Sequence, residues 1–122
     1  MARILLIDDE DDVREMFSEV LVRDGHEVVS LANGNGAAAQ DGHPPPDLVI
    51  TDILMPERDG MEVICALRRH APETKIIAIS GGCLLGPALY LKAAEVLGAA
   101  RTLAKPIAGA ELIAAVHELL AS

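Results

Sequence analysis

Acidic, hydroxyl and amine side chains follow short apolar segments at several points in this 122-residue sequence. Asp8 and Asp9 come directly after RILLI, Asp52 ends DLVITD, Ser80 ends KIIAIS, and Lys105 follows AARTLA. Three carboxylates held in one cleft would repel one another, so such a group needs a cation. A hard divalent ion such as Mg²⁺ takes oxygen ligands of this kind and also binds phosphate oxygens.

Lysine and serine supply the other parts of the same chemistry. Lys105 is a compact positive charge that can pair with a carboxylate or a phosphoryl oxygen, and the Ser80 hydroxyl can donate a hydrogen bond to such an oxygen. The metal and the lysine would offset negative charge while a positioned carboxylate attacks. These residue types therefore indicate a site that moves a phosphoryl group onto a carboxylate.

The elements that must position these residues are short strands and amphipathic helices in alternation. Continuous apolar runs are typical of strands buried on both faces, and apolar residues spaced three and four apart indicate helices. Asp11 or Asp12 is expected to cap the first helix, and Gly25 to follow its end. The predicted strands are Arg3–Asp8, His26–Leu31, Asp47–Asp52, Lys75–Ser80 and Ala99–Ala104. The predicted helices are Asp11–Asp24, Asn33–Gln40, Gly60–His70, Pro87–Leu97 and Ala108–Leu120.

This alternation predicts an α/β fold: a doubly wound sheet of five parallel strands, with five helices on its two faces. A length of 122 residues suits one domain. In such sheets functional side chains gather beyond the carboxyl ends of the strands, near the point where the strand order reverses. The polar residues described above all belong at that edge.

Composition narrows the class of protein. The net charge of −9 argues against direct binding of nucleic acid, which relies on Lys and Arg meeting phosphates. We also expect no membrane insertion, and we expect a cytoplasmic location, because we find neither a spanning apolar run nor a signal peptide. Cys65 and Cys83 are interpreted as free thiols. The four histidines are scattered along the sequence and are assigned no role.

The ordered set of motifs resembles the receiver domain of bacterial two-component response regulators. The resemblance covers essentially the whole chain, and it implies the strand order 2-1-3-4-5. The motifs that carry it are Asp8-Asp9, Asp52-x-x-Met55-Pro56, Asp59-Gly60, Ser80-Gly81 and Lys105-Pro106.

The resemblance implies a role for each matched position. Asp52 would be the phosphoacceptor, and Mg²⁺ (or Mn²⁺) would bind the side chains of Asp9 and Asp52 and the backbone carbonyl of Leu54, with Asp8 reaching the metal through water. Ser80 and Lys105 would contact the phosphoryl group. The bond before Pro106 would be cis.

The sequence departs from the pattern of the family at the switch position, in the long glycine-rich loop after Ser80, and at the residue two positions after Asp52. Thr102 stands where most members have the aromatic residue that rotates on phosphorylation, and Tyr90 is the alternative candidate for that role. We hypothesise that the loop containing Gly81 and Gly82 reports phosphorylation instead, because glycines make backbone rearrangement cheap. Leu54 is apolar where some relatives position water, which predicts slow autodephosphorylation.

The expected partners also follow from the resemblance. A sensor histidine kinase or a histidine phosphotransfer protein would donate the phosphoryl group. With no output domain after Ser122, output would be protein–protein contact through the face made by the fourth helix, fifth strand and fifth helix. A phosphate relay or sink is the alternative, and the chain would be a monomer or weak dimer.

Three other functions compete with this interpretation. An unphosphorylated scaffold of the same fold would have lost an acid or the lysine. A carrier of flavin mononucleotide would need a phosphate loop and aromatic rings, whereas this chain has acids there and only one Tyr and one Phe. A phosphatase with an aspartyl-phosphate intermediate would typically have a second Asp where Leu54 stands. We therefore expect a signalling phosphoacceptor rather than a turnover enzyme.

Overall fold

A computed structural model describes residues 2–32, 46–52, 60–70, 72–80 and 98–121 of the chain. Five strands lie in these ranges: β1 (Arg3–Ile7), β2 (Glu27–Leu31), β3 (Leu48–Asp52), β4 (Lys75–Ser80) and β5 (Arg101–Ala104). Three helices lie there too: α1 (Asp11–Arg23), α2 (Gly60–His70) and α4 (Gly109–Leu120). The helices predicted over 33–40 and 87–97 fall outside the described residues.

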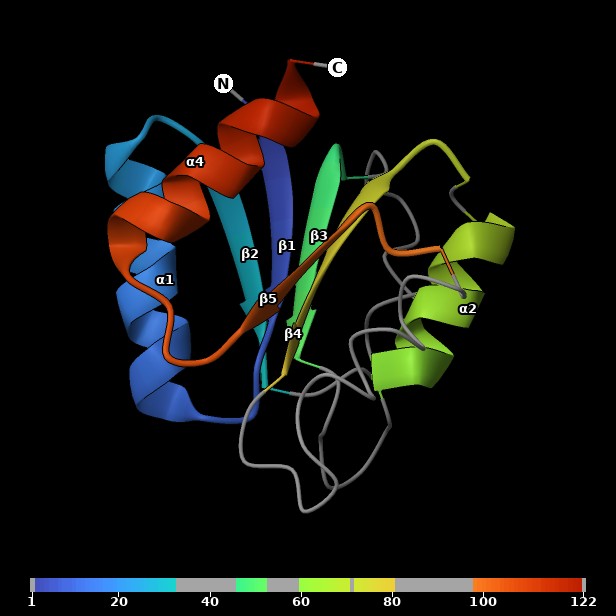
Figure 1. The fold of residues 1–122 in the computed structure, drawn as a ribbon, viewed down its shortest axis with the longest axis horizontal. Coiled ribbons are helices and arrows are strands. Elements are labelled where there is room, and N and C mark those ends of the chain that lie inside the picture. The colour runs from blue at the N-terminus through green and yellow to red at the C-terminus, as the bar shows by residue number, and fades with distance from the viewer. Residues whose placement is uncertain (1, 33–45, 53–59, 71, 81–97, 122) are drawn as a thin grey trace.

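The strands form one parallel sheet with the order β2-β1-β3-β4-β5, which confirms the predicted topology. In Figure 1 the strand arrows all point away from the two termini, so every strand ends at the same edge of the sheet. We call this the carboxyl edge, and the opposite one the amino edge. β5 begins at Arg101, two residues later than the sequence predicted, where it pairs with Ile77 of β4.

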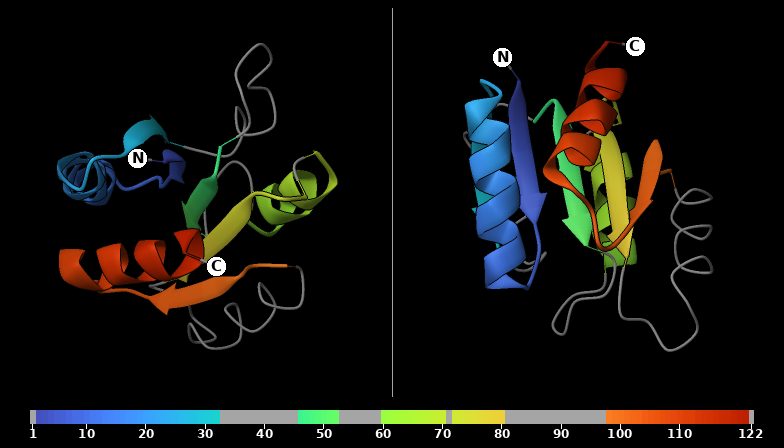
Figure 2. Two further views of the ribbon diagram at one scale, coloured as in Figure 1. Left: turned by 90° about the horizontal axis from the view of Figure 1, so that it is seen from above. Right: turned by 60° about the vertical axis from the view of Figure 1, so that its left-hand side comes forward.

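Alternation along the strands builds a separate core on each face of the sheet. Ile4 and Leu6 of β1 lie in the core with α1 and α4, whereas Leu5 and Ile7 lie in the core with α2. Figures 1 and 2 show α1 and α4 together on one face and α2 on the other. The continuous apolar runs therefore pack against helices on both faces of the sheet.

The ends of α1 show how local sequence sets the elements next to the site. The prediction that Asp11 or Asp12 caps the helix was wrong: both lie in its first turn, and Glu10 at the cap position makes no side-chain capping bond. Their negative charges still stabilise the helix, because they interact favourably with the positive end of the helix dipole.

The other end of α1 matches its prediction. Gly25 has φ of 93°, its N–H donates to Val22 and the N–H of His26 donates to Leu21. This is a Schellman motif, in which glycine adopts the left-handed conformation without steric cost. It turns the chain directly into β2.

Candidate functional site

Four neighbouring strands deliver the predicted site residues to the carboxyl edge. Asp8 follows β1, Asp52 ends β3, Ser80 ends β4 and Lys105 follows β5. Asp8, Asp52 and Ser80 are buried, with 1%, 4% and 0% of their surface exposed. The N–H of Lys105 donates to the Ser80 carbonyl at 2.8 Å, so backbone pairing between β4 and β5 continues to the site itself.

The ammonium of Lys105 lies at the centre of three carboxylates. Its Nζ is 2.7 Å from Glu10 Oε1, 3.0 Å from Asp52 Oδ2 and 3.1 Å from Asp8 Oδ2. Donor atoms of Asp8, Glu10 and Asp52 lie within 4.8 Å of one another, and we call these three residues the acidic cluster. The structure thus brings Asp52 and Lys105 together as the sequence predicted.

Hydrogen bonds hold Asp8 so that one oxygen faces the cluster. Its N–H donates to the Leu31 carbonyl, its Oδ1 accepts from the N–H of Glu10 at 2.9 Å, and its carbonyl accepts from Arg14 at 2.8 Å. The bond to Glu10 closes an Asx turn, which shapes the start of α1. The remaining oxygen, Oδ2, is left pointing at Lys105.

Burial and charge shift two groups of the site in the same direction. Burial raises the pKa of the Asp8 carboxyl, although the hydrogen bond from Glu10 and the charge of Lys105 oppose the shift. Burial alone would lower the pKa of Lys105. Its hydrogen bonds to Glu10 and Asp52 and the charges of Asp52 and Asp8 outweigh that effect, so the pKa is raised. The lysine is therefore a permanent cation at neutral pH.

The residues present fit a hard divalent cation. When all three carboxylates of the acidic cluster are ionised, one ammonium leaves two negative charges without compensation. Within the part of the chain that the structure describes, two buried side-chain oxygens, Asp8 Oδ2 and Ser80 Oγ, make no hydrogen bond. A buried polar atom that makes no hydrogen bond is costly, and at a functional site it indicates a ligand. Asp8 Oδ2 has the ion pair with Lys105 at 3.1 Å but no hydrogen bond. Oxygen donors and excess negative charge are what Mg²⁺ requires.

Glu10 is the member of the acidic cluster that the sequence analysis missed. Asp9, which was predicted as a ligand, is exposed and is not part of the cluster, so its role stays a prediction. The available signal was the run of three acids, Asp8-Asp9-Glu10, directly after β1. Alternation of side-chain direction along this run puts Asp8 and Glu10 on the same side and Asp9 on the other.

The other predicted positions divide into two groups. The bond between Lys105 and Pro106 is cis, as the resemblance implied, and Thr102 lies half-buried in β5 opposite Ala78. Leu54, Gly81, Gly82 and Tyr90 fall outside the described residues, so the structure does not test their roles.

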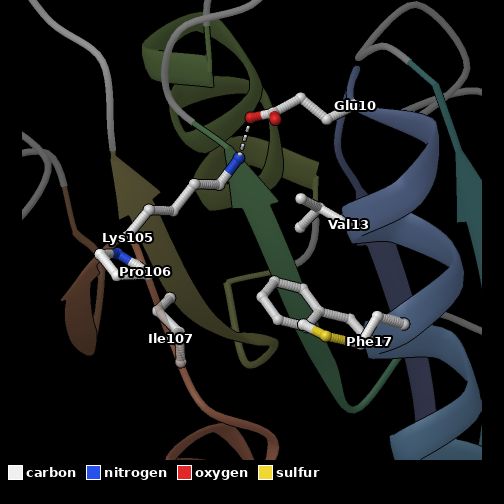
Figure 3. Close-up of a pocket in the computed structure, with 7 residues that line it drawn as sticks. Glu10, Val13, Phe17, Lys105, Pro106 and Ile107 are labelled. Atoms are coloured by element: carbon white, nitrogen blue, oxygen red, sulfur yellow. Dashed lines mark hydrogen bonds and ion pairs between the residues drawn. The ribbon is translucent and has the colours of Figure 1, made fainter.

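A groove opens beside Lys105 between α1 and the segment that joins β5 to α4. It has a volume of about 480 Å³. Figure 3 shows Val13 and Phe17 on the α1 side, Pro106 and Ile107 on the other, and the Glu10–Lys105 pair across one end. Met16, which also lines the groove, is 43% exposed. This is an apolar surface directly next to a charged site.

A second group of ionisable side chains lies at the amino edge. Asp24 Oδ2 is 2.9 Å from Nε2 of His26 and 2.5 Å from Nε2 of His117. His26 follows the Gly25 turn, and His117 lies in the last turn of α4. We call Asp24, His26 and His117 the histidine clasp, since it ties the end of α1 to α4.

The hydrogen bond to Ala2 distinguishes this clasp from a metal site. His26 Nδ1 accepts from the N–H of Ala2 at 3.1 Å, so in the neutral ring the proton lies on Nε2 and is donated to Asp24. A histidine that ligates metal through Nε2 carries its proton on Nδ1. The contact with Ala2 opposes that form, and the clasp is a hydrogen-bonded link between elements.

Within the described ranges, no helix is both long enough and apolar enough to cross a lipid bilayer.

Comparison with known proteins agrees with this geometry. The sequence matches the family model of the response regulator receiver domain over residues 4–117. The chemotaxis protein CheY of Bacillus subtilis is 33% identical over 120 residues, which are 97% of each chain. The DNA-binding transcriptional regulator NtrC of Azospirillum brasilense is 35% identical over 121 residues, which are 99% of this chain and 24% of NtrC. The chain thus spans about a quarter of the length of NtrC.

Solved structures show the same fold. The receiver domain of NtrX from Brucella abortus superposes with a TM-score of 0.89 at 28% identity, and the comparison covers 98% of each chain. Chemotaxis protein CheY4 of Vibrio cholerae gives a TM-score of 0.85 at 28% identity, also over 98% of each chain. Because the family model matches residues 4–117 and CheY matches over almost its whole length, the chain belongs to the receiver-domain family of two-component response regulators.

Proposed function

We propose that this chain accepts a phosphoryl group on Asp52, with Mg²⁺ bound beside it, and passes the signal on by protein–protein contact. The observation that carries the proposal is the position of Lys105 Nζ, 3.0 Å from Asp52 Oδ2 and within reach of Asp8. A buried carboxylate that faces a fixed cation and an excess of negative charge is arranged for phosphoryl transfer.

The proposed metal ligands are Asp8, Asp9, Asp52 and the backbone carbonyl of Leu54. Asp8 Oδ2 faces the other members of the acidic cluster and has no hydrogen bond within the described part of the chain, and exposed Asp9 follows it in the sequence. When bound, Mg²⁺ supplies positive charge against the phosphoryl oxygens. Mn²⁺, which also takes oxygen ligands, is the alternative ion.

The side chains of the protein perform the remaining parts of the step. An oxygen of Asp52 forms a bond to phosphorus, while the bond from phosphorus to the donor breaks and its electron pair stays with the leaving group. Lys105 holds Asp52 in place and pairs with a phosphoryl oxygen. The buried hydroxyl of Ser80, which has no partner within the described residues, donates to another oxygen.

The proposed donor is a sensor histidine kinase or a histidine phosphotransfer protein. The groove between α1 and Ile107 offers apolar contact area next to Lys105, which suits the docking of a donor. Residues 1–122 would act as one receiver domain, and output would use the face that includes β5 and α4. A relay or sink for phosphate is the alternative mode of output, and the cytoplasmic location stays a prediction.

Intact-mass measurement after incubation with acetyl phosphate tests this function. We expect a gain of one phosphoryl group that requires Mg²⁺ and is absent from an Asp52→Ala variant. Phosphorylation of the variant would show that another residue is the acceptor. No gain in the wild-type protein, with either Mg²⁺ or Mn²⁺, would favour a scaffold that is never phosphorylated.

A further inference from the structure

Glu10 makes the shortest contact with Lys105 and is the most exposed of the three carboxylates around it. The distance from Glu10 Oε1 to Nζ is 2.7 Å, and the Glu10 side chain is 58% exposed. The side chains of Asp8 and Asp52 are 1% and 5% exposed. The two buried acids are therefore fixed, whereas Glu10 reaches in from solvent on a flexible side chain.

An ammonium group has three hydrogen-bond donors. In this structure Lys105 donates to Glu10 and Asp52, and Asp8 Oδ2 lies 3.1 Å from the same nitrogen. A phosphoryl group on Asp52 adds oxygens that seek the same donors. These oxygens therefore compete with the carboxylates that already surround the ammonium. Glu10 is the partner that can leave at least cost, because water can solvate its carboxylate, whereas buried Asp8 and Asp52 have no such replacement.

We propose that Glu10 is a releasable tether: it holds Lys105 in the unphosphorylated protein and competes with the phosphoryl group for the ammonium. This inference rests on the proposed function, and it makes Glu10 a positioning residue that acts through Lys105. Release of Glu10 would also report phosphorylation without the aromatic residue that Thr102 replaces. The event that reports phosphorylation is the loss of one ion pair.

The position of the pair gives that loss a structural consequence. Glu10 lies between β1 and α1, and Lys105 lies between β5 and α4, so the pair ties two segments that are 95 positions apart in sequence. Figure 3 shows the pair spanning one end of the groove, with α1 on one side and Pro106 and Ile107 on the other. Release of Glu10 frees the two walls of the groove from each other at the end nearest Asp52.

The test compares Glu10→Gln with Glu15→Gln, which removes the same charge from an exposed position on α1. The readout is the affinity for beryllofluoride, a phosphoryl mimic, at saturating Mg²⁺. An exposed ion pair contributes little free energy, so its loss should change the affinity modestly. We expect Glu10→Gln to bind the mimic about two- to fivefold more tightly than wild type. Glu15→Gln should match the wild type.

Two further measurements separate this role from others. The affinity for Mg²⁺, measured by calorimetry, should be unchanged in Glu10→Gln; a clear loss would show that Glu10 is a metal ligand and would overturn the tether. The ¹H–¹⁵N signal of the Lys105 ammonium should shift in Glu10→Gln but not in Glu15→Gln. In wild type, the same signal should shift from its position in the unbound protein when the mimic binds.

Failure of the tether and failure of the proposed function give different results. If wild-type protein binds the mimic but Glu10→Gln binds it equally or more weakly, the tether is wrong and the phosphoacceptor site stands. If wild-type protein does not bind the mimic with Mg²⁺ present, the proposed function fails, and the competition fails with it.

Discussion

The two edges of the parallel sheet each hold a group of ionisable side chains. At the carboxyl edge, three carboxylates surround one ammonium, and among the residues that the structure describes Asp8 Oδ2 and Ser80 Oγ are buried without hydrogen bonds. At the amino edge, the carboxylate of Asp24 accepts from two imidazoles, and His26 is satisfied at both ring nitrogens. The histidine clasp is thus complete in itself, whereas the acidic cluster is not.

This difference indicates which edge was selected for chemistry. A fold retains buried polar atoms without partners and an excess of one charge only where function requires them, since each costs free energy. The clasp instead joins α1 to α4 with groups that satisfy one another. Similar side chains therefore serve a site at one end of the strands and a structural link at the other.

The largest expected effect comes from removing the one cation of the acidic cluster. Lys105→Ala leaves the carboxylates without compensation and removes a charge that would stabilise the transferring group. We expect phosphorylation by acetyl phosphate to slow about a hundredfold, as measured by intact mass over time. Arg101→Ala, which breaks an exposed pair with Glu118, is the control and should leave the rate unchanged. Equal rates in Lys105→Ala and wild type would remove the lysine from the mechanism.

Asp8→Asn should make the protein more stable when no Mg²⁺ is present. Burial raises the pKa of Asp8 above 3.8, so the folded state binds this proton more tightly than the unfolded state does. The protonated Asp8 therefore stabilises the fold below about pH 4, and this stabilisation is lost as the pH rises through the folded-state pKa of Asp8. At pH 7 with EDTA, the variant should melt a few degrees higher than wild type.

The control for Asp8→Asn is Asp9→Asn, because Asp9 is exposed and its charge is already solvated. Melting curves between pH 4 and 7.5 should show that the gain from Asp8→Asn grows with pH, while Asp9→Asn follows the wild type. Addition of Mg²⁺ should stabilise wild type more than Asp8→Asn. A less stable Asp8→Asn protein at pH 7 in EDTA would mean that its ion pair with Lys105 outweighs burial.

Asp24 should show the opposite dependence on pH. The hydrogen bond from His117, assisted by His26, lowers the pKa of Asp24 below its usual value of 3.8. The clasp therefore stabilises the fold above about pH 4, and this contribution is lost as the pH falls through the folded-state pKa. Asp24→Asn should lower the melting temperature by a degree or two at pH 7, and the difference should vanish in strong acid. A difference that persists at pH 2 would contradict the assignment.

The smallest expected effect is the response of the clasp to transition metals. Since His26 Nδ1 accepts from Ala2, we expect Zn²⁺ to raise the melting temperature of wild type no more than that of His117→Ala. Calorimetric titration at pH 7 checks this directly. Stoichiometric Zn²⁺ binding that His117→Ala abolishes would turn the clasp into a metal site and would remove the contrast between the two edges.

Much of this architecture could be predicted because each strand is a continuous apolar run bounded by polar residues. The strand order, the glycine turn after α1 and the meeting of Asp52 with Lys105 all followed from local patterns and the resemblance. The N-cap of α1 was predicted wrongly, because the helix begins at Asp11, so that Asp11 and Asp12 lie in its first turn and Glu10 occupies the cap position. Capping propensity alone does not decide which of several neighbouring acids precedes the helix.

What the sequence could not provide was contact between distant side chains that belong to no motif. The Glu10–Lys105 pair joins loops 95 positions apart, and the clasp joins Asp24 to His117 across 93 positions. Neither contact leaves a motif, since an exposed acid or a lone histidine has the same appearance in sequence wherever it lies. Only the packing of α4 against α1 and the closing of β5 onto β4 bring these side chains together.

The most direct test of the central claim is to identify the residue that receives the phosphoryl group. Borohydride reduces an aspartyl phosphate to homoserine, and peptide mass spectrometry then identifies the position. After reaction with acetyl phosphate and Mg²⁺, we predict homoserine at Asp52 alone. Homoserine at Asp8 or Asp9, or at no position despite folded protein and bound Mg²⁺, would contradict the assignment of the carboxyl edge as a phosphoacceptor site.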